Sequence, residues 1–187
     1  MGKFDPKIRH RRSIRLKEYD YSQAGAYFVT IVTWQRESLF GKTTNKEMQL
    51  NQLGKIADEC WQEIPNHFPN IELGAYVIMP NHIHGIIFIS DGRGAVLAPD
   101  EKNLHYEKGG ETPPLRKPTL GQIIAYFKYQ STKEMNLLGN TGAVTRFWQR
   151  NYYEHILRNE KELKNKTEYI EANPLLREQD EENPINT

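Results

Sequence analysis

The sequence predicts an α+β domain in which an antiparallel β-sheet has helices packed on one face. Three observations predict this class: segments rich in β-branched and aromatic residues, segments whose apolar residues recur with helical spacing, and turn signals between them. Along the chain these segments follow the order strand, helix, strand, strand, helix, strand, and a last helix is added after them. Such a sheet leaves its other face open to a ligand or to a further helix.

The first strand is predicted for Ala26 to Trp34, because β-branched and aromatic residues dominate this stretch after Gly25. A first helix follows, and Pro65 limits its C-terminal end. Its apolar residues lie three or four positions apart: Leu50, Leu53, Ile56, Ala57 and Trp61. This spacing predicts an amphipathic helix with one face in the core.

Two apolar runs, Ile71–Ile78 and Ile83–Ile89, are predicted to form a β-hairpin around Pro80-Asn81. Proline presets the backbone φ angle, and asparagine tolerates the tight positions of a turn. His82 and His84 stand at the start of the second strand. Because side chains on a strand alternate between the two faces, both imidazoles are predicted to point to the same face.

Residues 90–118 are predicted to form a long mobile loop, because they are rich in glycine, proline and scattered charge and show no periodicity. The next helix begins at Thr119, which has the spacing of a capping box with Gln122. The apolar side of this helix consists of Leu120, Ile123, Ile124, Phe127 and Met135. The glycines at 139 and 142 are predicted to end it.

The last strand is predicted for Arg146 to Leu157, and the last helix begins at Asn159, which has capping-box spacing with Glu162. This helix ends near Asn173, because Pro174 follows and the residue before proline avoids the helical conformation. The first six elements therefore have the βαββαβ order of a ferredoxin-like sandwich, to which the C-terminal helix is added.

The chain of 187 residues is predicted to form one domain at 25–174, with a basic N-terminal arm at 1–24 and an acidic tail at 175–187. The net charge of +1 does not indicate a polyanionic partner, whereas a basic arm can bind nucleic acid or be merely solvated. The single cysteine, Cys60, fits a reducing compartment. No apolar run has the length of a signal or a membrane span, so a soluble, cytoplasmic protein is expected.

Candidate functional side chains occur on the hairpin and on the last helix. Two neutral imidazoles side by side can hold a divalent cation, although strand histidines with polar partners are commoner. Tyr169 lies about 100° around the last helix from its apolar stripe, and Asn173 follows one turn later. Both could face the histidines if this helix packs against the second hairpin strand. The alternative is a tyrosine at the rim of an amphipathic helix and an asparagine C-cap.

Several segments occur together in an order that resembles a known family. They are Ala26-Tyr27-Phe28-Val29-Thr30, Val77-Ile78-Met79-Pro80-Asn81-His82-Ile83-His84, Phe147-Trp148-Gln149-Arg150-Asn151-Tyr152-Tyr153-Glu154-His155, and Tyr169-Ile170 with Asn173-Pro174. The sequence resembles the HUH-type single-tyrosine transposases of bacterial insertion sequences, and more closely the REP-associated tyrosine transposases. The resemblance covers 25–174, apart from the loop at 90–118.

The resemblance implies a DNA endonuclease and strand transferase that acts on single-stranded or hairpin DNA through a 5′-phosphotyrosine intermediate. Tyr169 is then the nucleophile, and His82, His84 and Asn173 bind a divalent metal ion, Mg²⁺ or Mn²⁺, which polarises the phosphodiester. Transposases outside the REP-associated branch commonly have glutamine where Asn173 stands, so this residue favours the REP-associated branch.

Contacts to DNA phosphates are predicted for basic residues of the arm and the domain, although basic residues on a solvated face need no ligand. They are Arg9, Arg11, Arg12, Lys128, Arg150 and Arg158. The alternative function is a nucleic-acid-binding module without chemistry. A zinc-dependent hydrolase is disfavoured, because Cys60 and Glu63 have no ligand spacing to the histidines. A monomer and a homodimer are both compatible with the sequence.

Overall fold

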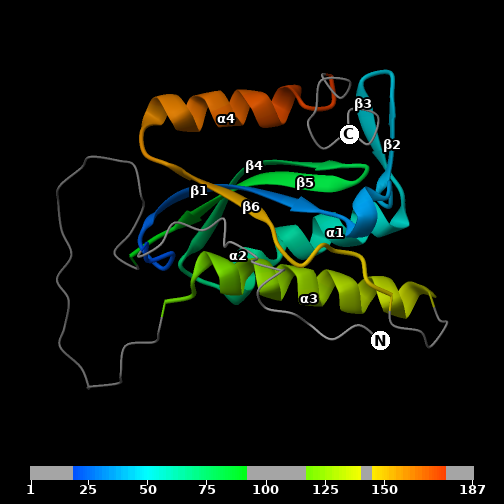
Figure 1. The fold of residues 1–187 in the computed structure, drawn as a ribbon, viewed down its shortest axis with the longest axis horizontal. Coiled ribbons are helices and arrows are strands. Elements are labelled where there is room, and N and C mark those ends of the chain that lie inside the picture. Colours follow the sequence, from blue (N-terminus) through cyan, green and yellow to red (C-terminus); the bar gives the residue numbers. More distant parts are fainter. Residues whose placement is uncertain (1–18, 92–116, 140–144, 176–187) are drawn as a thin grey trace, which may run out of the picture.

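The computed structural model describes residues 19–91, 117–139 and 145–175. In these residues a four-stranded antiparallel sheet lies between helices on both of its faces (Figure 1). The basic arm with Arg9, Arg11 and Arg12, the loop predicted at 90–118 except for its ends, and most of the acidic tail lie outside the described residues. None of the described helices combines the length and the hydrophobicity needed to cross a bilayer.

The sheet has the strand order β4-β5-β1-β6, so the two central strands are β5 and β1. β1 (Gly25–Val32) pairs with β5 (His82–Ile89) and with β6 (Tyr153–Leu157), while β4 (Ile71–Met79) pairs with β5 on its other side. All of these pairings are antiparallel. The antiparallel α+β class predicted from the sequence is confirmed.

The first face of the sheet is covered by α1 (Gln52–Gln62), the short α2 (Ile64–His67) and α3 (Leu120–Gly139). The main hydrophobic core lies between them and the sheet. The predicted capping box at the start of α3 is confirmed, since the Gln122 side chain accepts a hydrogen bond from the Thr119 backbone at 2.8 Å. Trp61 is fully buried in this core and lies directly over Gly85.

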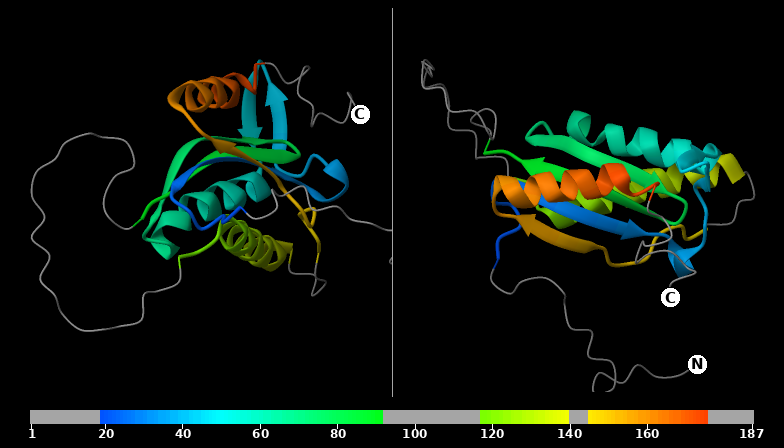
Figure 2. Two further views of the ribbon diagram at one scale, coloured as in Figure 1. Left: turned by 60° about the vertical axis from the view of Figure 1, so that its left-hand side comes forward. Right: turned by 90° about the horizontal axis from the view of Figure 1, so that it is seen from above.

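The second face is covered by α4 (Glu160–Ala172), which runs back along the sheet after β6 (Figure 2). Asn159 caps this helix as predicted, accepting a hydrogen bond from the Glu162 backbone at 2.9 Å. A smaller apolar cluster fixes α4 to the sheet and contains Phe28, Ile86, Leu157 and Ile170. The added C-terminal helix therefore occupies the face that the other helices leave open.

Several element predictions were wrong: Trp34, predicted in the first strand, lies after its end, and the short α2 was not predicted. The hairpin of β2 (Gly41–Thr44) and β3 (Glu47–Leu50) was missed, and Leu50 ends β3 instead of belonging to α1. The two turn residues Asn45 and Lys46 have φ of 52° and 65°, the left-handed conformation that tight hairpin turns require. β6 is also shorter than the predicted strand, because before Tyr153 only Trp148 makes a β-bridge, an isolated one with Thr33 just after β1.

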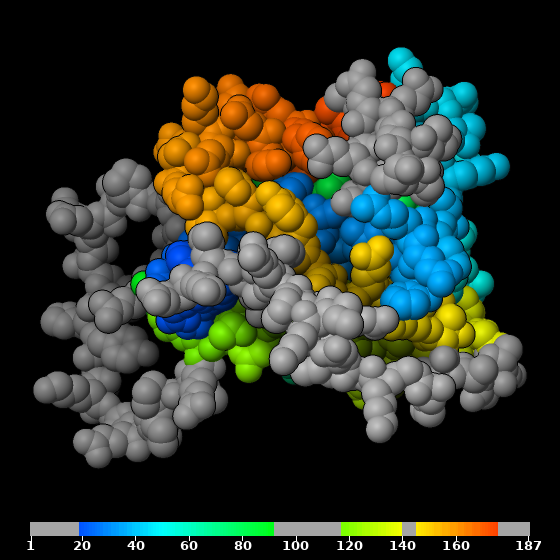
Figure 3. All heavy atoms as spheres, in the orientation of Figure 1, coloured from blue at the N-terminus to red at the C-terminus, as the bar shows by residue number. Residues whose placement is uncertain are grey.

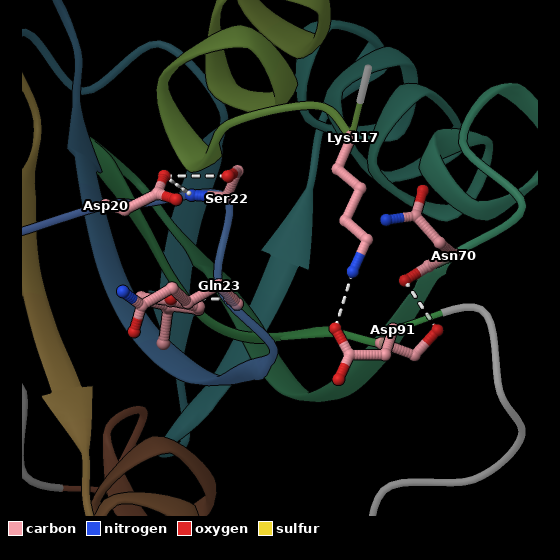
Figure 4. A network of polar contacts seen from close by, with 8 residues as sticks. Asp20, Ser22, Gln23, Asn70, Asp91 and Lys117 are labelled. Atoms are coloured by element: carbon pink, nitrogen blue, oxygen red, sulfur yellow. Dashed lines mark hydrogen bonds and ion pairs between the residues drawn. The ribbon is translucent and has the colours of Figure 1, made fainter. Parts of the chain in front are cut away.

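Polar contacts involve Asp91 and Lys117, the described residues on either side of 92–116 (Figure 4). The Lys117 ammonium lies 2.6 Å from an Asp91 carboxylate oxygen, and Ser90 donates a hydrogen bond to the Asn70 carbonyl at 2.8 Å. Both contacts lie beyond Ile89, whereas the histidine pair lies at the other end of β5. The rise along a strand puts about 17 Å between His84 and Ile89, so these contacts are remote from the histidines.

Candidate metal and nucleophile site

His82 and His84 project from β5 toward α4, as the strand alternation predicts. Ile83 belongs to the main core on the opposite face, which fixes the orientation of its two neighbours. Both histidines are buried, and their ring centroids are 4.5 Å apart. The prediction that both imidazoles share one face is thus confirmed, and the two rings lie close enough to act on one ligand.

Hydrogen bonds from neighbouring polar side chains orient both rings. His82 Nδ1 lies 2.9 Å from Asn81 Oδ1, and His84 Nδ1 lies 2.9 Å from Thr30 Oγ1. A carboxamide oxygen only accepts, so the Nδ1 of His82 donates and its Nε2 carries the lone pair. The Thr30 hydroxyl can either donate or accept, and when it accepts from Nδ1, the Nε2 of His84 also presents a lone pair.

Electrostatics keep His84 neutral. Burial lowers the pKa of His84 to about 3, and the nearby Lys166 ammonium lowers it further. The ring of Phe28 stacks on His84 with centroids 5.4 Å apart and an interplanar angle of 24°. A neutral imidazole is the form that binds metal ions, so protons do not compete for this nitrogen near neutral pH.

Tyr169 reaches this pair from α4 of the same chain. Its hydroxyl lies 3.3 Å from His84 Nε2, and its side chain is 37% exposed. The Lys166 ammonium lies one helical turn earlier, 4.5 Å from the centroid of Phe28 and 5.1 Å from that of Tyr169. The phenol is therefore held between a buried imidazole and a cation, with an open side toward solvent.

Asn173 follows Tyr169 by four residues and forms the C-cap of α4. Its side chain is buried, with 3% exposure, and no hydrogen-bond donor among the described residues reaches its Oδ1. A buried carbonyl oxygen without a donor is costly, unless an ion or a water satisfies it. This oxygen is of the kind that hard divalent cations prefer.

The described residues contain no cluster of three histidine, cysteine or carboxylate side chains suited to a metal ion. Cys60 belongs to α1 and packs with the core on the other face of the sheet, and burial raises the pKa of its thiol to about 11. A site at the histidine pair therefore needs a third protein ligand of another type, such as an amide oxygen.

Of the predicted phosphate-binding residues, Lys128 has an internal role. Its ammonium donates hydrogen bonds to the carbonyls of Gln149 and Asn151 at 2.9 and 3.0 Å. Burial and the nearby Arg146 lower the pKa of Lys128 to about 8. Arg150 and Arg158 are exposed, so their predicted phosphate contacts stay predictions.

Sequence reasoning missed Thr30 and Lys166. Thr30 faces His84 directly across β1 and β5, and this register appears only once the strands are paired. Lys166 precedes Tyr169 by three residues on α4, a spacing that puts both on one side of the helix. That spacing was visible in the sequence and could have identified Lys166 as a neighbour of the tyrosine.

Comparisons with known proteins find relatives of the chain, although no protein-family model matches it. An uncharacterized protein of Haemophilus influenzae is 42% identical over 182 residues, covering 96% of both chains. A putative REP-associated tyrosine transposase of the same species is 24% identical over 163 residues, which are 83% of this chain and 73% of that protein.

A solved structure of a REP-associated tyrosine transposase bound to a REP hairpin has the same fold, with a TM-score of 0.55. That match has 17% sequence identity and covers 88% of this chain and 74% of the other. The sequence and the fold thus lead to the same group of proteins. The chain belongs to one family with the 42%-identical Haemophilus influenzae protein, and it is a homologue of the REP-associated tyrosine transposases.

Proposed function

We propose that this protein is a metal-dependent endonuclease and strand transferase for single-stranded or hairpin DNA, with Tyr169 as the nucleophile. The observation that carries the proposal is the 3.3 Å contact between the Tyr169 hydroxyl and His84 Nε2, beside the ring of His82. The relationship to transposases, one of which was solved with a REP hairpin, supports DNA as the substrate class.

The residues present fit a divalent metal ion. The neutral His84, the oriented His82 and the buried Oδ1 of Asn173 supply two imidazole nitrogens and one amide oxygen. When bound, Mg²⁺ or Mn²⁺ would polarise a non-bridging phosphate oxygen and neutralise developing charge. The Nε2 atoms of both histidines and Oδ1 of Asn173 would hold the ion, and the Tyr169 hydroxyl, 3.3 Å from His84 Nε2, would lie next to it.

The chemical step is a transesterification. The phenol oxygen of Tyr169 forms a bond to phosphorus, and the bond between phosphorus and the 3′ oxygen breaks. The phenol loses its proton, and the leaving 3′ oxygen gains one to become a free 3′-OH. The Lys166 ammonium is close enough to the phenol ring to favour negative charge there. Because one ester replaces another, the product can be rejoined to a second strand.

The test is a search for the covalent intermediate. Purified protein is incubated with a pool of fluorescein-labelled strands that carry varied hairpins and flanks, with Mn²⁺ or with EDTA, and is then resolved on a denaturing gel. We expect a protein–DNA adduct only with Mn²⁺. Tyr169→Phe should abolish the adduct while DNA binding survives, and the control Tyr153→Phe should keep the adduct.

Two results would contradict this function. An adduct that persists in Tyr169→Phe, or that maps to Tyr153, would assign another nucleophile. The alternative is a nucleic-acid-binding module without chemistry, which the fold match to a hairpin complex also supports. It predicts salt-dependent binding that EDTA does not change, and no adduct with any strand of the pool.

A further inference from the structure

Tyr153 is an exposed aromatic side chain on the sheet face that carries the histidines. Its side chain is 52% exposed, although it lies in β6 of the main sheet. Other exposed large apolar side chains among the described residues lie on α3, which covers the opposite face, and directly after α4. They are Tyr129, Leu137, Leu138 and Leu175. Tyr153 and Tyr169 thus flank the histidines from two different elements.

The strand register places Tyr153 in one row with the candidate site. Tyr153 is the direct partner of Thr30 across β6 and β1, and Thr30 is the direct partner of His84 across β1 and β5. Directly opposite residues share a face, so the three side chains point to the same side of the sheet. Two strand spacings separate Tyr153 from His84, which is about 10 Å.

The segment that leads to Tyr153 is fixed in place before any ligand arrives. The Lys128 ammonium holds the carbonyls of Gln149 and Asn151, and the Gln149 backbone N–H donates to the Val32 carbonyl at 2.9 Å. The preceding Tyr152 is buried in the main core. An aromatic ring on such a fixed segment loses little conformational freedom when a ligand stacks on it.

Tyr153 is half exposed on the sheet face that α4 covers. In Figure 3 the orange atoms of α4 and the yellow-orange atoms of β6 lie on two sides of blue atoms of β1. Arg150 is exposed three residues before Tyr153 and can neutralise a phosphate. An exposed ring, a fixed backbone and a nearby cation are the parts with which proteins hold a single nucleic acid strand.

We propose that Tyr153 is the stacking platform for an unpaired base that lies within three nucleotides of the phosphodiester at the Tyr169 site. The inference rests on the proposed function and adds the position of the neighbouring base. Successive nucleotides rise at least about 3.4 Å each, so three of them span the distance from His84 to Tyr153. Stacking needs only the flat face of a base, so Tyr153 binds any base and adds affinity without reading sequence.

An isolated exposed tyrosine is common and needs no function, so the test compares Tyr153 with Tyr129, which is 68% exposed on α3. Binding is measured by fluorescence anisotropy in EDTA, so that no chemistry occurs. The two probes are fluorescein-labelled oligo(dT) of about twenty nucleotides and a strand of equal length and charge made of abasic sites. Thermal unfolding of each variant confirms that it is folded.

We expect Tyr153→Ala to weaken oligo(dT) binding by about 5- to 150-fold, the range measured for one stacked base. Binding of the abasic strand should stay within about twofold, and Tyr153→Phe and Tyr129→Ala should behave like the wild type. Equal oligo(dT) affinity in Tyr153→Ala and wild type would overturn the inference, and so would an equal loss for both strands. A covalent adduct on Tyr169 together with either result would leave the proposed function intact and refute only the stacking role.

Discussion

Replacing Gly85 by alanine tests how the packing of Trp61 stabilises β5, the strand that carries His82 and His84. A Cβ at this position would lie 2.4 Å from Cζ2 of Trp61, a full ångström closer than the 3.4 Å at which ordinary contact begins. The indole of Trp61 cannot easily move away, because it is fully buried and its ring centroid lies 5.3 Å from that of Phe127. Either Trp61 or β5 must therefore move.

Overpacking of this kind typically costs about 1–3 kcal/mol. For a chain of this size, each kcal/mol corresponds to about 2–4 °C in Tm. The control is Gly139→Ala at the last residue of α3, where an added Cβ meets no atom within 4 Å. That change should be neutral or stabilise by up to about 1 kcal/mol, since alanine restricts the unfolded chain.

Urea unfolding followed by tryptophan fluorescence measures both variants, and a shift of the midpoint without a change in slope reports stability alone. Because Gly85 adjoins His84, a displaced β5 should also weaken Mn²⁺ binding in Gly85→Ala. If Gly85→Ala proves as stable as the wild type, the close packing of Trp61 on β5 is not what holds this strand.

Three further predictions concern the site and its surroundings. Thr30→Val removes the hydrogen bond that orients His84, and we expect a 10- to 100-fold loss of Mn²⁺ affinity by calorimetry that Thr30→Ser largely restores. The pKa of Lys128 is about 8 in the folded protein, below its value in the unfolded chain. The free-energy cost of burying the charged ammonium therefore applies completely below pH 8 and decreases as the pH rises above it. The unfolding free energy of wild type relative to Lys128→Met should therefore rise between pH 8 and 10, and a flat difference would contradict the burial. Arg150→Gln should weaken DNA binding for all sequences and reduce the salt slope by about 0.7, whereas an unchanged slope would mean that Arg150 contacts no phosphate.

Local patterns in the sequence predicted much of the fold. The dense β-branched run of β1, the two apolar runs around Pro80-Asn81 and both capping boxes correspond to elements of the structure. Each of these signals depends on residues close together in the chain. The face shared by His82 and His84 followed from strand alternation in the same way.

The features that the sequence did not predict depend on polar or long-range contacts. The β2–β3 hairpin is short and largely polar, and only Met48 and Leu50 of β3 alternate with polar residues, which is a weak signal over four residues. The predicted strand is interrupted before Tyr153, where the Lys128 ammonium from α3 binds the carbonyls of Gln149 and Asn151, a contact between distant segments that local patterns do not show. The partnership of Thr30 with His84 depends on which residues of two strands are opposite, and the turn residues alone do not determine that register.

The central claim is that a divalent ion binds between the histidines beside Tyr169. Anomalous diffraction from a crystal of the protein soaked in Mn²⁺ tests it most directly. We expect one strong peak within about 2.3 Å of Nε2 of His82, Nε2 of His84 and Oδ1 of Asn173, with the Tyr169 hydroxyl next to it. A peak at another set of side chains, or no peak at the histidines at saturating Mn²⁺, would contradict it.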